Sequence, residues 1–262
     1  MGTNMDSPAS FTYHPSLERF NISPHAYLAA NPSLTDLVVS AVLFDIPLNR
    51  SEFADNSNNK PPRTLLIQRA ATDGYALYWE CPGGGVELGL THVLSPSNTA
   101  KGDGPDIKTE IGDSQPSKYY EKSVQQGHSA GDDTILIALW REVFEETGLR
   151  MTRVEALIDD TCEFGNKEGT IKARKFTFLV DFERGQRGEE LGAGMGMGIK
   201  LNPAEHQDVM WATEEEVVSG EELGSEPGTD GKTRGRKIVF AFDDQRERLI
   251  EGFRILNESL ST

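Results

Sequence analysis

Cysteine and long apolar runs are scarce in this sequence. The 262 residues include two cysteines, Cys81 and Cys162, too few for the disulfide framework that holds many small secreted domains together. No apolar run approaches the roughly 20 residues of a transmembrane helix, and the first residues lack the basic start and apolar core of a secretory signal. We therefore expect a protein of the cytoplasm or the nucleus that is not secreted and has no membrane partner.

Positive charge is also in short supply. Lysine and arginine number 26 against 42 aspartates and glutamates, which gives a formal net charge of −16. So acidic a chain is a poor non-specific ligand for nucleic acid or anionic membrane, and nucleic acid is not an expected partner. A phosphate substrate would need positive charge from another source, and a divalent cation is the obvious one.

Segments of strand and helix character alternate along the chain, which favours a layered α/β fold. Strands are expected at 37–44, 64–69, 75–81, 152–163, 171–182 and 208–212, and helices at 135–147, 214–218 and 242–256. Residues 1–33 are polar and predict an N-terminal arm, followed by one main domain at 34–262. Residues 90–132 are rich in Ser, Gly, Pro, Asp and Lys with little periodicity, so we expect an insertion there.

The expected helix at 135–147 carries three carboxylates on one side. Glu142, Glu145 and Glu146 are related by i, i+3 and i+4 spacings and fall within an arc of about 100°. They lie in the last turns, where the helix end is already negative, so the arrangement is unfavourable without a cation. A solvated acidic face, with Arg141 paired to Glu145, is the plainer interpretation of this helix taken alone.

Two other segments favour a cation site. Residues 82–89, PGGGVELG, follow an expected strand, and their glycines let the backbone approach phosphate or metal closely. Glu205 and His206 stand just before a short expected strand downstream. Together with the acidic helix, these segments place carboxylates and an open backbone in the same α/β domain.

These residues resemble the box of the Nudix hydrolase family, G-x5-E-x7-R-E-U-x-E-E-x-G-U, where U is a bulky aliphatic residue. Residues 141–149, REVFEETGL, match every specified position of the second half, and residues 82–89 resemble the first half. Leu90 stands where the box has its first glutamate. The resemblance implies that residues 90–132 interrupt the box and that Asp133 replaces that glutamate. It also implies the Nudix fold, a mixed β-sheet sandwiched between α-helices.

The resemblance further implies a hydrolase that cleaves the pyrophosphate linkage of a nucleoside diphosphate linked to another moiety X. Its cofactor would be Mg²⁺ or Mn²⁺, which neutralises phosphate oxygens and activates water. Glu142 and Glu146 would be the primary metal ligands, with Glu145 sharing this role or acting through water. The carbonyl of Gly83 would be a further ligand.

The remaining roles follow from the same resemblance. Arg141 would orient a glutamate of the helix through an ion pair. Glu205 is the first candidate for the general base or an extra metal ligand, and Glu145 is the second. Residues expected at the substrate are Arg69, Trp79, Gly83, Gly84 and Gly85.

Other functions stay open at this stage. A Nudix-like module that binds nucleotide as a sensor, without turnover, is the main alternative, because the box departs from its pattern at Leu90 and carries an insertion. A serine hydrolase using Ser129 of the G-x-S-x-G sequence at 127–131 is weaker, since polar residues precede it where that motif needs a buried strand. The box leaves the identity of X open, and a homodimer is compatible with the sequence.

Overall fold

The structure is a computed structural model, and it describes residues 11–46, 61–73, 75–89, 131–184, 198–222 and 235–261. Its elements are β1 (Thr12–Tyr13), the 3₁₀ helix η1 (Pro15–Phe20), α1 (Pro24–Ala30), β2 (Asp36–Asp45), β3 (Arg63–Arg69), β4 (Trp79–Glu80), β5 (Gly83–Gly85), α3 (Ile135–Thr147), β6 (Met151–Gly165), β7 (Lys172–Phe182), β8 (His206–Thr213), α4 (Glu214–Ser219) and α5 (Asp243–Ser259). Ser129 and nearly all of the expected insertion lie outside the described residues. Within the described part of the chain, no helix is long and apolar enough to cross a membrane.

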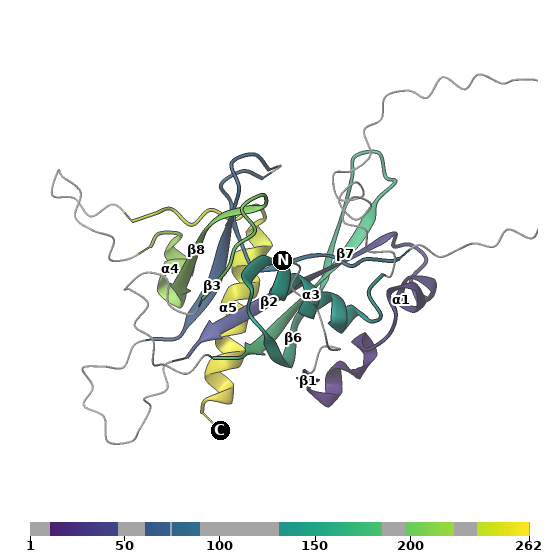
Figure 1. Ribbon diagram of the computed structural model, residues 1–262, viewed down its shortest axis with the longest axis horizontal. Helices are drawn as coiled ribbons and strands as arrows, with labels where there is room; N and C mark the ends of the chain where they lie inside the picture. Colours follow the sequence, from purple (N-terminus) through teal and green to yellow (C-terminus); the bar gives the residue numbers. More distant parts are fainter. Residues whose placement is uncertain are drawn as a thin grey trace, which may run out of the picture.

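Strand β2 organises the sheet (Figure 1). The described strands form one mixed sheet in the order β1-β6-β7-β2-β3-β4, with β5 added beside β2 and β8 beside β3. β2 runs parallel to β7 along residues 36–43. It pairs antiparallel with β5 at residues 38–40 and with β3 at residues 44–45. Because β7 occupies one edge of β2, the glycine strand β5 and the strand β3 follow each other along the opposite edge.

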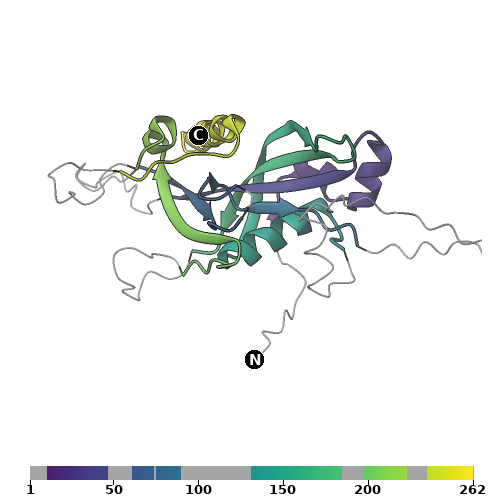
Figure 2. The ribbon, with the colours of Figure 1, turned by 90° about the horizontal axis from the view of Figure 1, so that it is seen from above.

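Helices cover both faces of this sheet, as Figure 2 shows, with α3 on one side and α4 and α5 on the other. The side chains of β2 alternate between the two layers, as a strand requires. Val39 and Leu43 belong to the apolar cluster under α3, whereas Val42 and Phe44 belong to the cluster under α5. The expected fold class, a mixed sheet between helices, is confirmed.

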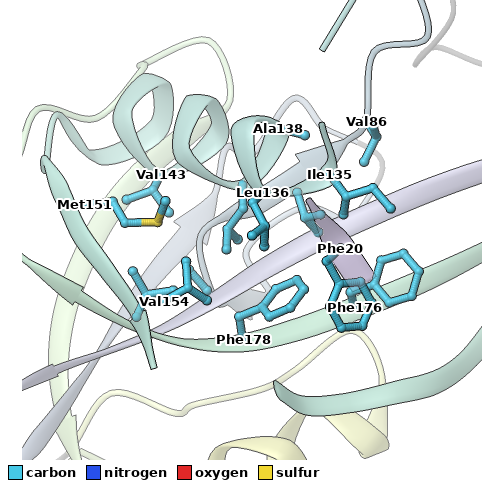
Figure 3. Close-up of a cluster of buried hydrophobic side chains, with 14 of the residues drawn as sticks. Phe20, Val86, Ile135, Leu136, Ala138, Val143, Met151, Val154, Phe176 and Phe178 are labelled. Carbon is cyan, nitrogen blue, oxygen red and sulfur yellow. The ribbon is translucent and has the colours of Figure 1, made fainter. Parts of the chain in front are cut away.

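The N-terminal residues contribute to the cluster under α3 (Figure 3). Phe20, the last residue of η1, is buried, and its ring lies 5.2 Å from those of Phe176 and Phe178 on β7, edge to face. Apolar residues of α3, among them Leu136 and Val143, close the cluster from the other side. The described part of the expected arm therefore packs on the main core, and the domain boundary at residues 33 and 34 stays a prediction.

Most strands and helices match their expected ranges to within a few residues, but the strand expected at 75–81 is much shorter. Only Trp79 and Glu80 form β4, and the residues before them make a turn. Leu77 adopts a φ of 68°, a left-handed conformation that ends an extended strand. Its N–H donates to the carbonyl of Arg69, which closes the turn onto the end of β3. The turn thereby fixes Glu80 near the end of β3.

Two adjacent valines on α4 test how this helix docks. The Val217 side chain is 0% exposed in the cluster under α5, whereas Val218 is 54% exposed. We expect Val217→Ala to lower the free energy of unfolding by about 2 kcal/mol, from lost apolar burial and the cavity left behind. Val218→Ala should change it by no more than about 0.5 kcal/mol. Urea unfolding of both variants measures the difference, and equal losses would contradict the packing of α4.

Candidate metal centre

Helix α3 has a capping residue at each end, and these caps fix the positions of its glutamates along the chain. The Thr134 hydroxyl accepts the N–H of Ile137 and caps the start. Gly148, with a φ of 70°, caps the end in the left-handed conformation. Both bounds agree with the expected helix. Its buried apolar stripe, which includes Leu139 and Val143, docks α3 on the sheet and carries the glutamates of the last turns with it.

The glycine strand β5 lies directly against these glutamates. The N–H of Gly83 donates to Oε2 of Glu146 at 2.7 Å. A Cβ on Gly84 would stand 2.5 Å from a carboxylate oxygen of Glu142, and one on Gly83 only 2.2 Å from the backbone oxygen of Val39. At Gly83 the obstacle is backbone, so a side chain does not fit there, whereas at Gly84 a side chain would push the Glu142 carboxylate away from its present place.

Arg141 contacts four other residues of the site. Its Nε and Nη2 donate to the two carboxylate oxygens of Asp132, both at 2.9 Å, and Nη2 also donates to the Gly85 carbonyl at 3.0 Å. Its Nη1 contacts Glu142 at 2.9 Å and Glu145 at 3.2 Å. The guanidinium therefore joins the last turns of α3, the glycine strand and the segment that precedes α3, and its side chain is largely enclosed by these partners.

Asp132 is the aspartate that contacts Arg141, whereas Asp133 was expected to take the place of the missing glutamate of the box. The Asp132 carboxylate accepts the Glu87 N–H at 2.7 Å as well as the Arg141 guanidinium, and the Asp132 N–H donates to the Glu87 carbonyl at 2.8 Å. Asp133 is exposed. The shorter aspartate reaches Arg141 from one position earlier in the chain because the backbone at residue 132 pairs with the glycine-rich segment.

Helix α3 and strand β5 form one side of the site, and residues at the start of β8 form the other side. Glu146, Glu205 and His206 bring one potential ligand atom each to within 4.8 Å of one another. His206 is buried, with Nε2 at 3.7 Å from Oε1 of Glu146. The structure thus brings the predicted residues Glu146 and Glu205 together, while Glu142 lies on the Gly84 side and is not part of this compact group.

Glu80 belongs to the site and was missed from the sequence. Its Oε1 lies 3.1 Å from Nε2 of His206, and both of its carboxylate oxygens accept Nη1 of Arg69, at 2.8 and 3.1 Å. A signal was available, because neighbouring residues on a strand face opposite sides. Trp79 is buried in the cluster under α5, so Glu80 must face the opposite side of the sheet, where α3 lies.

Burial dominates the electrostatics of the two inner glutamates. Loss of water raises the pKa of Glu142 to about 7, although the charge of Arg141 opposes the rise. Burial also raises the pKa of Glu146 well above its usual range, with further upward contributions from Glu142 and Glu80. The Gly83 N–H acts in the other direction but is outweighed. Without a cation, these carboxylates hold protons at pH values where an exposed glutamate is ionised.

Burial would lower the pKa of Arg141, but its hydrogen bonds to the Asp132 carboxylate and the charges of its acidic neighbours outweigh burial and raise that pKa above the ordinary value. The guanidinium therefore stays charged. Glu145 is the most open of the three helix glutamates, with 33% of its side chain exposed. It stands at the rim of the site, in contact with Arg141.

Two residues predicted at the substrate have other partners in the structure. Arg69 forms ion pairs with Glu80 and Asp73, at 2.8 and 2.6 Å. Trp79 is 1% exposed, and its indole N–H donates to the Lys237 carbonyl. The enclosure of the Trp79 ring gives no support to its predicted contact with substrate.

The solved structures that match this chain include Nudix hydrolases. A NUDIX hydrolase from Nitrosomonas europaea matches over 84% of this chain and 88% of its own, with 14% identity and a TM-score of 0.41. An Ap4A hydrolase from C. elegans matches over 86% and 99%, with 11% identity and a TM-score of 0.42. The NUDIX domain of Shewanella oneidensis NrtR, solved with ADP ribose, matches over 90% and 99%, with 14% identity and a TM-score of 0.41.

Nudix hydrolases are thus what this chain is similar to, as the box predicts. No family model and no curated protein matches the sequence.

The raised pKa values predict how cation binding depends on pH. The carboxylates of Glu142 and Glu146 bind protons more tightly in the cation-free folded state than in the unfolded chain, where their pKa is near 4.5. The free energy of unfolding should therefore begin to fall as pH rises above about 4.5, and it should continue to fall through pH 7. A cation must displace the same protons, so its affinity should rise up to roughly tenfold per pH unit for each proton released, from about pH 5 upward.

Isothermal titration of Mn²⁺ at several pH values measures this slope. Glu142→Gln should flatten it, because one of the titrating groups is gone. Asp181→Asn is the matched control, since burial also raises the pKa of Asp181 at the end of β7, away from the site. It should leave the slope unchanged. An affinity that is constant from about pH 5 to 8 would contradict the account of Glu142 and Glu146.

Proposed function

We propose that this chain is a divalent-cation-dependent hydrolase that cleaves the pyrophosphate linkage of a nucleoside diphosphate joined to another moiety X. One observation carries the proposal. The buried carboxylate of Glu146 is held by the Gly83 N–H beside Glu205 and His206, and within the described residues it has no ion pair with lysine or arginine.

A buried carboxylate of this kind needs either a proton or a cation. The penalty for removing an ionised carboxylate from water is several kcal/mol, far more than one backbone N–H restores. Glu142, Glu146 and Glu205 supply oxygen donors, which are the ligands that Mg²⁺ and Mn²⁺ prefer. The residues present therefore fit a hard divalent cation. When bound, such a cation polarises a phosphoryl oxygen and lowers the pKa of a water molecule.

The chain's own residues divide the remaining work. Glu146 and Glu205 would hold the cation, and the bare backbone of Gly83 and Gly84 leaves room for a phosphate beside it. Arg141 fixes the direction of the neighbouring helix glutamates through ion pairs rather than by contact with substrate. For the general base we propose Glu205 or, at the open rim, Glu145.

Replacement of Glu146 tests the proposal. Glu146→Gln keeps the shape of the side chain and the bond from Gly83 but removes the charge, so kcat/KM should fall by roughly 10²-fold or more, the scale of losing one partner of a buried charge pair. The assay uses a panel of nucleoside diphosphate derivatives that includes ADP-ribose and Ap4A, and a coupled phosphatase releases inorganic phosphate from the products for measurement. Mg²⁺, Mn²⁺ and chelator are the compared conditions.

Glu215→Gln is the matched control, because Glu215 is an exposed glutamate on α4. It should keep full activity. Turnover that survives both chelator and Glu146→Gln would overturn the proposal, and insensitivity to chelator is what a serine hydrolase using Ser129 would show. Nucleotide binding without turnover, in a folded protein with cation bound, would favour the sensor module instead.

A further inference from the structure

His206, the first residue of β8, stands between two carboxylates that come from different elements. Its Nε2 lies 3.1 Å from Oε1 of Glu80 on β4 and 3.7 Å from Oε1 of Glu146 on α3. The first distance is that of a hydrogen bond, and the second is too long for one. The side chain is 2% exposed, so the imidazole is fixed by its neighbours and not by water.

The neighbours also decide which nitrogen carries the proton. The Glu80 carboxylate accepts two bonds from Arg69 and is therefore the acceptor for Nε2 of His206 as well. Nδ1 is buried and has no hydrogen-bond partner among the described residues. A proton on Nδ1 would be an unsatisfied buried donor. We accordingly assign the neutral tautomer with the proton on Nε2.

This tautomer gives the two carboxylates different surroundings. Glu80 forms an ion pair with the guanidinium of Arg69 on one side and contacts His206 on the other. Arg69 is itself also paired with Asp73. Glu146 keeps the backbone bond from Gly83 and has no comparable cation. The imidazole therefore ties one carboxylate to arginine and leaves the other without such a partner.

We propose that His206 is a positioning residue for the cation site, acting by holding Glu80 against Arg69 so that Oε1 of Glu146 stays available to a divalent cation. The inference rests on the proposed function, because it assumes that Glu146 binds the cation. It assigns His206 a role through hydrogen bonding rather than as a ligand through Nε2, the nitrogen that faces both carboxylates, since a nitrogen that donates its proton has no lone pair for a metal. Partners that orient metal ligands in this way contribute about 10- to 100-fold to metal affinity.

The test compares two substitutions at this position by Mn²⁺ titration. His206→Ala removes the donor, and the dissociation constant should rise about 10- to 100-fold. His206→Gln places a side-chain amide N–H near the position of Nε2, so it should restore affinity to within about threefold. Gln207→Ala is the matched control, because Gln207 is the next residue on β8, is exposed and bonds to Gln68 and Ala71. Its affinity should equal that of the wild type.

Pulsed electron paramagnetic resonance of Mn²⁺ bound to the wild type gives a second readout. The spectrum should show no nitrogen bonded directly to the metal. A bonded imidazole nitrogen would overturn the inference, as would His206→Ala with wild-type affinity. The melting temperature of His206→Ala, measured in chelator, shows whether this variant folds. If it does not fold, the wild-type spectrum and the Mn²⁺ affinity of His206→Gln still test the inference. A wild type that binds no Mn²⁺ would instead overturn the proposed function itself.

Discussion

Desolvation of the glutamates at the end of α3 is the constraint on which the rest of the site depends. The apolar stripe of the helix docks it against the sheet, and Glu142 and Glu146 are carried out of water with it. Each buried charge must then find a partner. Glu142 has Arg141, whereas Glu146 has the Gly83 N–H and the neighbouring group of Glu205 and His206. This difference between the two carboxylates is the basis for the cation site that we propose.

The fold supplies the two walls of this site from one strand. β2 pairs with the glycine strand β5 near its start and with β3 near its end, and β3 in turn carries β4 and β8. The expected insertion leaves this arrangement intact because Glu87 and Asp132 exchange hydrogen bonds across its base. Gly131 approaches Gly89 so closely that a Cβ would meet its N at 2.2 Å. The two halves of the box are therefore adjacent in space although some 40 residues separate them in the sequence.

Periodicity and end signals were enough to place most of the helices and strands, whereas the candidate site residues came from the resemblance to the Nudix box. The helix at 135–147 follows from Thr134, its apolar stripe and Gly148, and the main strands follow from their apolar runs. Asp132 could not be distinguished from Asp133, because the choice depends on how the backbone pairs across the insertion. Glu80 was overlooked, and Trp79 was expected at the substrate, whereas the structure buries the Trp79 ring in the cluster under α5. Their alternation on a two-residue strand becomes informative only once the turn at Leu77 fixes where that strand begins.

We propose Glu146 as a ligand in a divalent-cation site built from α3, β5 and the start of β8. The most direct measurement is a crystal structure of the protein grown with Mn²⁺, with the metal located by its anomalous scattering. The account predicts a peak bonded to a carboxylate oxygen of Glu146, beside Glu205 and the backbone of Gly83. A peak confined to an exposed acidic surface such as the start of α4, or an empty site in a crystal of the intact fold, would contradict it.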